Sequence, residues 1–240
     1  MATTFSPTEQ DVERYRRFRT LSIDLNHRMV KTIPKHAYDE VGDAIGIRRD
    51  GVLVFDNEDM PGVLMDCCLH DWFENGENLV QRYAEAHPGK PGTDESFLLS
   101  AYTQAKYRVL LTEYSVPDAG VDCHDVLSNE DLFLMDLALS RSLGSGAAAR
   151  GMALATRTLP LGDYSMTTGA FLPIHSGEAF KNMPHSVKGG LFEGPGGVAL
   201  SIVRACLAAG AADWAGYENI RTKKARIEPR VRFKRRRRLT

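Results

Sequence analysis

The residue types with the clearest chemical potential gather in one short segment and its approach. They are Asp66, Cys67, Cys68, His70 and Asp71, preceded by Asp56, Glu58 and Asp59. Asp66 and His70 are four residues apart, so a helix would place a carboxylate and an imidazole on one face, where they could share a metal ion or a proton. A metal ion needs more ligands than these two, and no Cys-x-x-Cys or His-x-x-x-His spacing supplies them.

The same segment also has a purely structural interpretation. Cys67 and Cys68 can pack as small apolar side chains, while His70 and the neighbouring acids lie on a solvated face. The distant run Cys123-His124-Asp125 could complete a metal site only if the fold brought the two segments together. We therefore expect neither a bound metal ion nor a cofactor.

A cysteine nucleophile would need a thiol of lowered pKa beside an orienting base. Cys123 and His124 are adjacent on a predicted strand, where consecutive side chains point to opposite faces, so they are poor partners for each other. Ser165 lacks the flanking glycines of a nucleophile elbow. The sequence predicts no catalytic residue, and a small metal-dependent or thiol hydrolase using the segment Asp56–Asp71 is the alternative.

Two glycine-rich stretches are candidates for phosphate-binding loops. Gly144-Ser145-Gly146 has no following lysine, and the stretch from Gly189 to Gly197 contains Glu193 and Pro195. Neither matches the pattern in which backbone amides and a lysine cradle a phosphate, so we interpret both stretches as flexible connectors.

The last twenty residues, 221–240, form a cationic arm. They hold eleven Lys or Arg and one acid, Glu228, for a net charge of +10. The rest of the chain holds 19 basic and 30 acidic residues, a net of −11, so the overall charge of −1 conceals two opposed parts. Guanidinium groups fit phosphate oxygens bidentately, and phosphate contacts release counterions from nucleic acid. The residues expected to contact nucleic acid are Arg230, Arg232, Lys234, Arg235, Arg236, Arg237 and Arg238.

Other partners could engage the same arm. It could bind an acidic protein surface, including its own body or a second copy in a homo-oligomer, attach reversibly to anionic lipid, or stay a solvated tail. Val231 and Phe233 alternate with basic residues, a period of two that predicts a short strand docking on the body. We expect a non-catalytic binding or assembly protein whose arm engages a polyanion, with nucleic acid as the favoured partner.

The bulk composition limits the class of protein. The chain has 240 residues, of which 43% are hydrophobic and 25% charged, as in an ordinary globular protein. Charged residues interrupt every apolar run in the first thirty residues, so we expect no secretory signal. Four cysteines do not make a disulfide framework, and the longest stretch without Asp, Glu, Lys or Arg, residues 164–177, is shorter than the ~20 residues of a membrane span. We expect a cytoplasmic protein without a membrane span.

Helices must position most of these groups in the first part of the chain. Apolar residues at intervals of three and four predict a helix over 8–31, which Pro34 ends, and a shorter one over 37–45. Two more helices are predicted from the apolar residues between Val63 and Phe73 and from Leu79, Val80 and Tyr83, and Asp94 is the predicted cap of another. A short strand, Val52–Phe55, interrupts them.

Strands dominate the next part. They are predicted at 107–114, 121–126, 132–139, 152–159 and 164–171, and closing them into a barrel would remove exposed edges. The predicted fold is α+β, with a mainly helical region at 8–105 and a five-stranded antiparallel, SH3-like barrel at 106–174. A Gly-rich segment with a helix follows at 175–220, and the basic arm at 221–240. Val198, Ile202, Val203, Cys206 and Leu207 mark one side of that C-terminal helix, which should pack on the body.

Three short motifs carry a resemblance to a known group of proteins. They are Tyr15-Arg16-Arg17-Phe18-Arg19, Leu53-Val54-Phe55-Asp56, and Ala155-Thr156-Arg157 followed by Met166-Thr167-Thr168-Gly169. With them, residues 14–174 resemble uncharacterised bacterial proteins that have a helical first half and a small β-rich second half, some relatives of which carry a SEC-C zinc motif. The paired cysteines of that motif are absent from this sequence. The resemblance implies an unknown function and carries no metal role to this chain.

Overall fold

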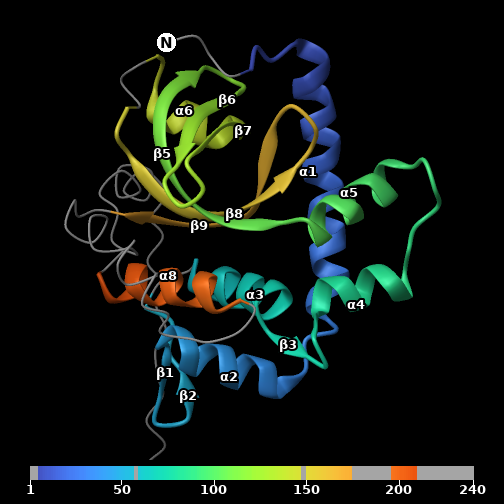
Figure 1. Ribbon diagram of the computed structural model, residues 1–240, viewed down its shortest axis with the longest axis vertical. Coiled ribbons are helices and arrows are strands. Elements are labelled where there is room, and N and C mark those ends of the chain that lie inside the picture. Colours follow the sequence, from blue (N-terminus) through green and yellow to red (C-terminus); the bar gives the residue numbers. More distant parts are fainter. Residues whose placement is uncertain (1–4, 57–58, 147–149, 175–195, 210–240) are drawn as a thin grey trace, which may run out of the picture.

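Helices form the first part of the chain, as a computed structural model shows (Figure 1). The structure describes residues 5–56, 59–146, 150–174 and 196–209. The helices of this part are α1 (Glu9–Val30), α2 (Lys35–Ile45), α3 (Met60–His70), α4 (Leu79–Ala86) and α5 (Asp94–Thr103). None of the described helices is long and apolar enough to cross a membrane.

Helix α1 confirms the periodicity of its sequence. Tyr15, Phe18, Leu25 and Met29 are buried along one face, and they belong to the main hydrophobic core. A capping box, in which Thr8 and Asp11 exchange hydrogen bonds, satisfies free amides of the first turn. The amphipathic face and this cap together explain why the helix begins and ends close to the predicted residues.

Two features of the helical part differ from the prediction. The strand at Val52–Phe55 is only Val52–Leu53 (β2), which pairs with Arg48–Arg49 (β1) in a small hairpin. Helix α3 ends at His70, and Phe73–Glu74 (β3) pairs with Glu77–Asn78 (β4) in a second hairpin. Each hairpin turn contains an Asp or Asn and a Gly with positive φ, which favour a tight reversal over a longer strand or helix. The helix over 94–103 is capped by the Thr93 hydroxyl, not by Asp94.

The β-rich part is a closed five-stranded barrel. Its strands are β5 (Lys106–Val116), β6 (Gly120–Asp125), β7 (Glu130–Met135), β8 (Ala153–Pro160) and β9 (Ser165–Ile174), and the order around the barrel is β5-β6-β7-β9-β8. The expected closure is confirmed, but the expectation of a purely antiparallel barrel is wrong, because β7 and β9 pair in parallel at Leu134 and Ser165. A ring with an odd number of strands cannot alternate direction at every pair, so one parallel pair is required.

The strand expected at 132–139 is shorter than predicted. Strand β7 ends at Met135, and Leu137–Leu143 forms helix α6. Asp136 explains the change, because its carboxylate accepts hydrogen bonds from the amides of Ala138 and Leu139 and so caps the helix.

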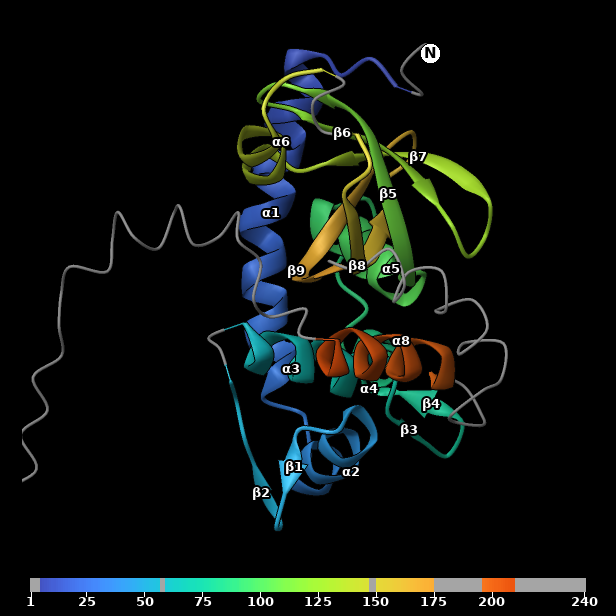
Figure 2. The ribbon, with the colours of Figure 1, turned by 90° about the vertical axis from the view of Figure 1, so that its left-hand side faces the viewer.

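The C-terminal helix α8 (Gly197–Ala208) contacts α2, β8 and β9. It buries Ile202, Val203 and Cys206, but the expectation that Val198 shares their side is wrong, because Val198 is 52% exposed. In Figures 1 and 2, α3 and α8 lie between the barrel and α2, and α1 runs along the side of both parts. One hydrophobic core cluster includes residues of the helices and of the barrel, so the two parts share an interior. The arm lies outside the described residues.

Candidate functional site

Helix α3 positions the segment that the sequence singled out. It contacts α1, α2, α4 and β9, and its last residues, from Asp66 to His70, are buried. Cys67 and Cys68 are buried, as the structural interpretation expected. The solvated face expected for the polar residues is wrong, because Asp66, His70 and Asp71 are 8%, 5% and 7% exposed. Buried charges are stable only when they are paired and hydrogen-bonded, so a charged carboxylate at Asp66 or Asp71 needs a partner.

The partner is Arg157, which comes from strand β8 of the barrel. Its Nε donates to Asp66 Oδ2 at 2.8 Å, and its Nη2 donates to Asp71 Oδ2. The hydroxyl of Thr168, from β9, donates to Asp66 Oδ1 at 2.7 Å. The Arg157 guanidinium lies 5.1 Å from the centre of the Tyr107 ring, a cation–π contact. We call Asp66, Asp71, Arg157 and Thr168 the Arg157 cluster.

The two carboxylates of the Arg157 cluster differ in their electrostatic state. Burial raises the pKa of Asp66, but the charge of Arg157 and the hydrogen bonds outweigh it, and the pKa lies below its ordinary value. Burial raises the pKa of Asp71 to about 7, with Arg157 acting against the rise and Asp66 adding to it. Asp66 is therefore ionised at neutral pH, whereas Asp71 gains or loses its proton near pH 7.

His70 shares a helix with Asp66 but does not act with it as a ligand pair. Its ring stacks on Tyr102 with centroids 6.1 Å apart, and its Nε2 has no hydrogen-bond partner among the described residues. Burial lowers the pKa of His70 to about 3, and the charge of Arg157 contributes. The imidazole is consequently neutral at physiological pH.

The thiols and the candidate metal ligands are not arranged for chemistry in the described ranges. All four cysteines are buried and unpaired with one another, and burial raises the pKa of every one, Cys68 and Cys206 to about 12. A thiolate nucleophile would need the opposite shift. His124 lies 2.7 Å from Asp131, and within residues 5–56, 59–146, 150–174 and 196–209 no three His, Cys, Asp or Glu groups could hold a metal ion.

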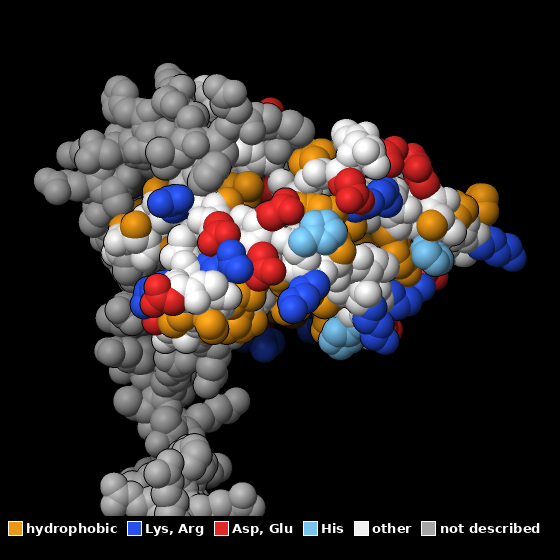
Figure 3. Space-filling model, turned by 90° about the horizontal axis from the view of Figure 1, so that it is seen from below, with side chains coloured by type: hydrophobic (Ala, Val, Ile, Leu, Met, Phe, Trp, Pro, Cys, Tyr) orange, Lys and Arg blue, Asp and Glu red, His pale blue; other side chains and the backbone are white. Residues whose placement is uncertain are grey.

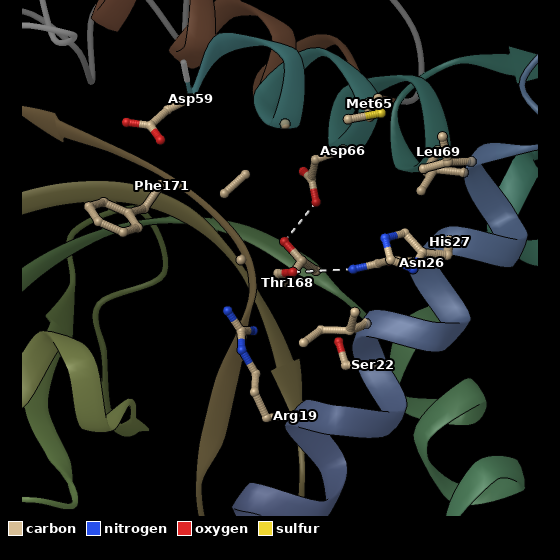
Figure 4. Close-up of a pocket in the computed structure, with 15 residues that line it drawn as sticks. Arg19, Ser22, Asn26, His27, Asp59, Met65, Asp66, Leu69, Thr168 and Phe171 are labelled. Atoms are coloured by element: carbon tan, nitrogen blue, oxygen red, sulfur yellow. Dashed lines mark hydrogen bonds between the residues drawn. The ribbon is translucent and has the colours of Figure 1, made fainter. Parts of the chain in front are cut away.

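A cavity of about 440 Å³ opens between α1, α3 and β9, and Asp66 and Thr168 lie at its inner side (Figure 4). We call it the α1–α3 cavity. Arg19 points into it from α1, and Asn26 donates to the Thr168 carbonyl at 3.3 Å. Its lining residues are Arg19, Ser22, Ile23, Asn26, His27, Val30, Asp59, Gly62, Met65, Asp66, Leu69, Thr168, Gly169, Ala170 and Phe171.

A second, more open cavity of about 390 Å³ lies on the other side of the Arg157 cluster, and we call it the α8 cavity. Asp71 and Arg157 line it, together with Lys106, Arg108 and the first residues of α8. Arg108 is held by Asp125 Oδ2 at 2.6 Å and by Glu130 Oε2 at 3.0 Å, so its charge is already compensated. The Arg157 cluster therefore separates two cavities and presents one carboxylate to each.

The structure brings together only part of what the sequence proposed. Asp66 and Asp71 meet in one cluster, Asp59 lies at the α1–α3 cavity, and Asp56 pairs with Arg49 at 3.3 Å. Every residue expected to contact nucleic acid, from Arg230 to Arg238, lies outside the described residues. Composition and spacing missed Arg157 and Thr168, because their partners on α3 are 86 to 102 residues away.

A usable signal for the missed residues was present in the resemblance motifs. Ala155-Thr156-Arg157 supplies the guanidinium of the Arg157 cluster, and Met166-Thr167-Thr168-Gly169 supplies its hydroxyl. Tyr15-Arg16-Arg17-Phe18-Arg19 ends at the arginine that points into the α1–α3 cavity. Two of the three motifs thus meet at the Arg157 cluster and the adjoining cavity, whereas no residue of Leu53-Val54-Phe55-Asp56 lines that cavity.

Comparison with known proteins identifies a family and no individual relative. A family model described as "Family of unknown function (DUF7986)" matches residues 9–187. Searches of curated proteins and of solved structures found no match. The matched range includes the Arg157 cluster, the barrel and every lining residue of the α1–α3 cavity. The chain belongs to this family of unknown function.

Proposed function

We propose that this chain is a non-catalytic binding protein whose cationic arm engages a polyanion, with nucleic acid as the favoured partner. The supporting observation is the charge of +10 in residues 221–240, attached to a body of net charge −11. The proposed contact residues are Arg230, Arg232, Lys234, Arg235, Arg236, Arg237 and Arg238. Such a density of guanidinium and ammonium groups attracts phosphate without requiring a particular spacing.

Many charged side chains of the body are paired with one another. Arg48 lies 2.9 Å from Asp43, and Arg82 lies 2.6 Å from Glu74. On the face shown in Figure 3, both basic and acidic side chains are present on the described surface. Phosphate contacts from the arm would position the chain on nucleic acid without reading its sequence.

Binding to a fluorescent 20-base-pair DNA duplex tests the proposal, with the full chain and fluorescence anisotropy across a series of salt concentrations. The test variant changes Lys234, Arg235, Arg236, Arg237 and Arg238 to Gln. Loss of these contacts should weaken binding and reduce the slope of log affinity against log salt by about 0.9 for each phosphate contact removed. The measured quantities are the dissociation constant and this slope.

A matched control removes the same number of charges from the body. The exposed residues Arg16, Arg17, Lys31, Arg49 and Lys90 are changed to Gln, which should leave most of the affinity and the slope intact. Equal loss in the two variants, or no loss in the arm variant, would contradict the proposal. A pull-down with and without nuclease separates the alternatives, since partners that survive nuclease treatment would favour an acidic protein surface or a homo-oligomer over nucleic acid.

The alternative class is a small hydrolase that uses the segment Asp56–Asp71, and it stays a prediction. The observation in its favour is Asp71, a buried carboxyl with a pKa near 7 that lines the α8 cavity, where it could donate or accept a proton. The raised pKa values of Cys67 and Cys68 favour such an acid–base form of the alternative over a thiol form. The SH3-like character of the barrel and the likeness to proteins with a SEC-C motif likewise stay predictions.

A further inference from the structure

The α1–α3 cavity is lined by both apolar and polar side chains. Ile23, Val30, Met65, Leu69, Ala170 and Phe171 supply apolar side chains, and the polar side chains are those of Arg19, Ser22, Asn26, His27, Asp59, Asp66 and Thr168. The volume of about 440 Å³ lies within the range of about 300–1,000 Å³ typical of small-molecule sites. A cavity with this lining suits a ligand that has a hydrocarbon body and one polar group.

The hydrogen bonds of the polar side chains decide the sign of that group. Asp66 accepts from Thr168 with one oxygen and from Arg157 with the other. Ser22 is bonded to the Tyr102 hydroxyl at 2.6 Å. Asp66 and Ser22 thus already take part in hydrogen bonds within the protein, and the negative charge of Asp66 is compensated by Arg157.

Arg19 has hydrogen-bond donors that no described residue accepts. Its Nη1 donates to the Thr167 carbonyl at 2.8 Å, and this is the single hydrogen bond that its guanidinium makes among the described residues. A guanidinium carries five N–H donors, so the remaining donors are available to a ligand. Arg19 therefore brings positively charged hydrogen-bond donors to the cavity.

Strand β9 is shaped to hold this guanidinium at the cavity. Gly169 has a φ of +116°, and a Cβ atom at this position would lie 3.2 Å from Arg19 Nη2. A glycine permits both the backbone conformation and the close approach of the guanidinium. Arg19 is thus positioned by the Thr167 carbonyl and by the absence of a side chain on Gly169.

We propose that the α1–α3 cavity binds a small organic acid. Its carboxylate accepts from the Arg19 guanidinium, and its hydrocarbon body lies along Ile23, Met65 and Phe171. A carboxylate matches the planar donors of arginine and gains charge-assisted hydrogen bonds. This inference does not depend on the arm, because every residue that carries it belongs to α1, α3 or β9.

Octanoate is the probe, with octan-1-ol and octylamine as probes of the same chain length and different charge. Isothermal titration of the full chain should show saturable binding of octanoate, much weaker binding of the alcohol and none of the amine. Arg19→Gln should weaken octanoate binding by about tenfold or more, because charge-assisted hydrogen bonds are lost. Arg17→Gln is the matched control, since Arg17 lies two residues away on α1, is exposed, and pairs with Asp94 on α5.

A second variant tests the cavity without touching Arg19. Gly62 lines the cavity on α3, and an added Cβ there would meet no atom within 4 Å, so Gly62→Leu should fold and fill part of the cavity. Loss of octanoate binding in Gly62→Leu, with an unfolding temperature at or above that of wild type, would support the site. No saturable octanoate binding, equal binding of octanol, or wild-type affinity in Arg19→Gln would overturn it.

Discussion

His70 and Asp71 are neighbours in sequence whose burial has opposite electrostatic results. Burial lowers the pKa of the imidazole to about 3 and raises that of the carboxyl to about 7, because in each case the low-dielectric interior disfavours the charged form. Both groups therefore prefer to be neutral in the folded protein. Over overlapping pH ranges, His70 binds fewer protons in the folded protein than in the unfolded chain, and Asp71 binds more.

The free energy of unfolding should show this opposition as pH changes. Between about pH 4 and 6.5, the unfolded chain binds more protons at His70, which makes stability rise with pH, and the folded protein binds more at Asp71, which makes it fall. Asp71→Asn removes the group that makes the free energy of unfolding fall as pH rises. We expect its free energy of unfolding, relative to wild type, to rise from pH 4 to pH 7 by up to about 1.4 kcal/mol per unit.

Urea unfolding at several pH values measures this difference. The exposed Asp24→Asn serves as the control for loss of one carboxylate at the surface. A difference between Asp71→Asn and wild type that does not change from pH 4 to pH 7 would show that Asp71 is not the buried, proton-exchanging group described above.

At the scale of the elements, two glycines have opposite structural roles. Gly120 begins β6, and a Cβ atom there would collide with the Leu134 carbonyl oxygen of β7 and lie 2.8 Å from the Phe133 ring. Gly62 lies in the first turn of α3 with open space around it. The barrel thus requires a glycine where two strands approach closely, whereas the helix does not require one.

Alanine substitution should separate these two roles. Gly120→Ala should lower the free energy of unfolding by about 1–3 kcal/mol, because the neighbouring backbone must shift. Gly62→Ala should raise it by about 0.4–1 kcal/mol, because the unfolded chain loses freedom and the helix accepts the side chain. Thermal and urea unfolding measure both changes, and a stable Gly120→Ala would mean that β6 and β7 lie further apart.

At the scale of the whole molecule, the Arg157 cluster joins the helical part to the barrel. Asp66 and Asp71 come from α3 and its end, whereas Arg157 and Thr168 come from β8 and β9. Around this polar contact, the core cluster continues from Phe18 of α1 to Leu172 of β9. An interior shared in this way favours unfolding of both parts together.

Arg157→Leu should therefore destabilise the whole fold. It leaves the buried Asp66 carboxylate without a counter-charge and Asp71 without its hydrogen-bond donor, a change that costs about 3–5 kcal/mol. Far-UV circular dichroism and tryptophan fluorescence during urea unfolding should report the same transition, at a lower urea concentration than in wild type. Arg141→Leu is the control, since its pair with Asp118 is 63% and 67% exposed and should contribute less than about 1 kcal/mol. Equal effects of the two substitutions would show that the cluster does not hold the parts together.

The sequence by itself determined the elements whose signals are local. The period of Tyr15, Phe18, Leu25 and Met29 predicted α1, and the five β-rich segments predicted the barrel strands, because side-chain periodicity follows directly from backbone geometry. Some element boundaries differ from the prediction because a local hydrogen bond favours another structure. Asp136, for example, caps α6, so the strand ends at Met135. The parallel pair could also have been derived, since five alternating strands cannot close without one.

Only the tertiary structure decided which polar groups meet. The sequence favoured a solvated face for Asp66 over a metal site or a proton relay with His70, and it did not indicate a buried ion pair, because the partners Arg157 and Thr168 are 91 and 102 residues away. The α1–α3 cavity likewise needs three elements to enclose it, and no one segment carries its pattern. Local spacing determines the face on which a side chain lies, whereas the packing of α3 against the barrel determines which distant charge compensates it.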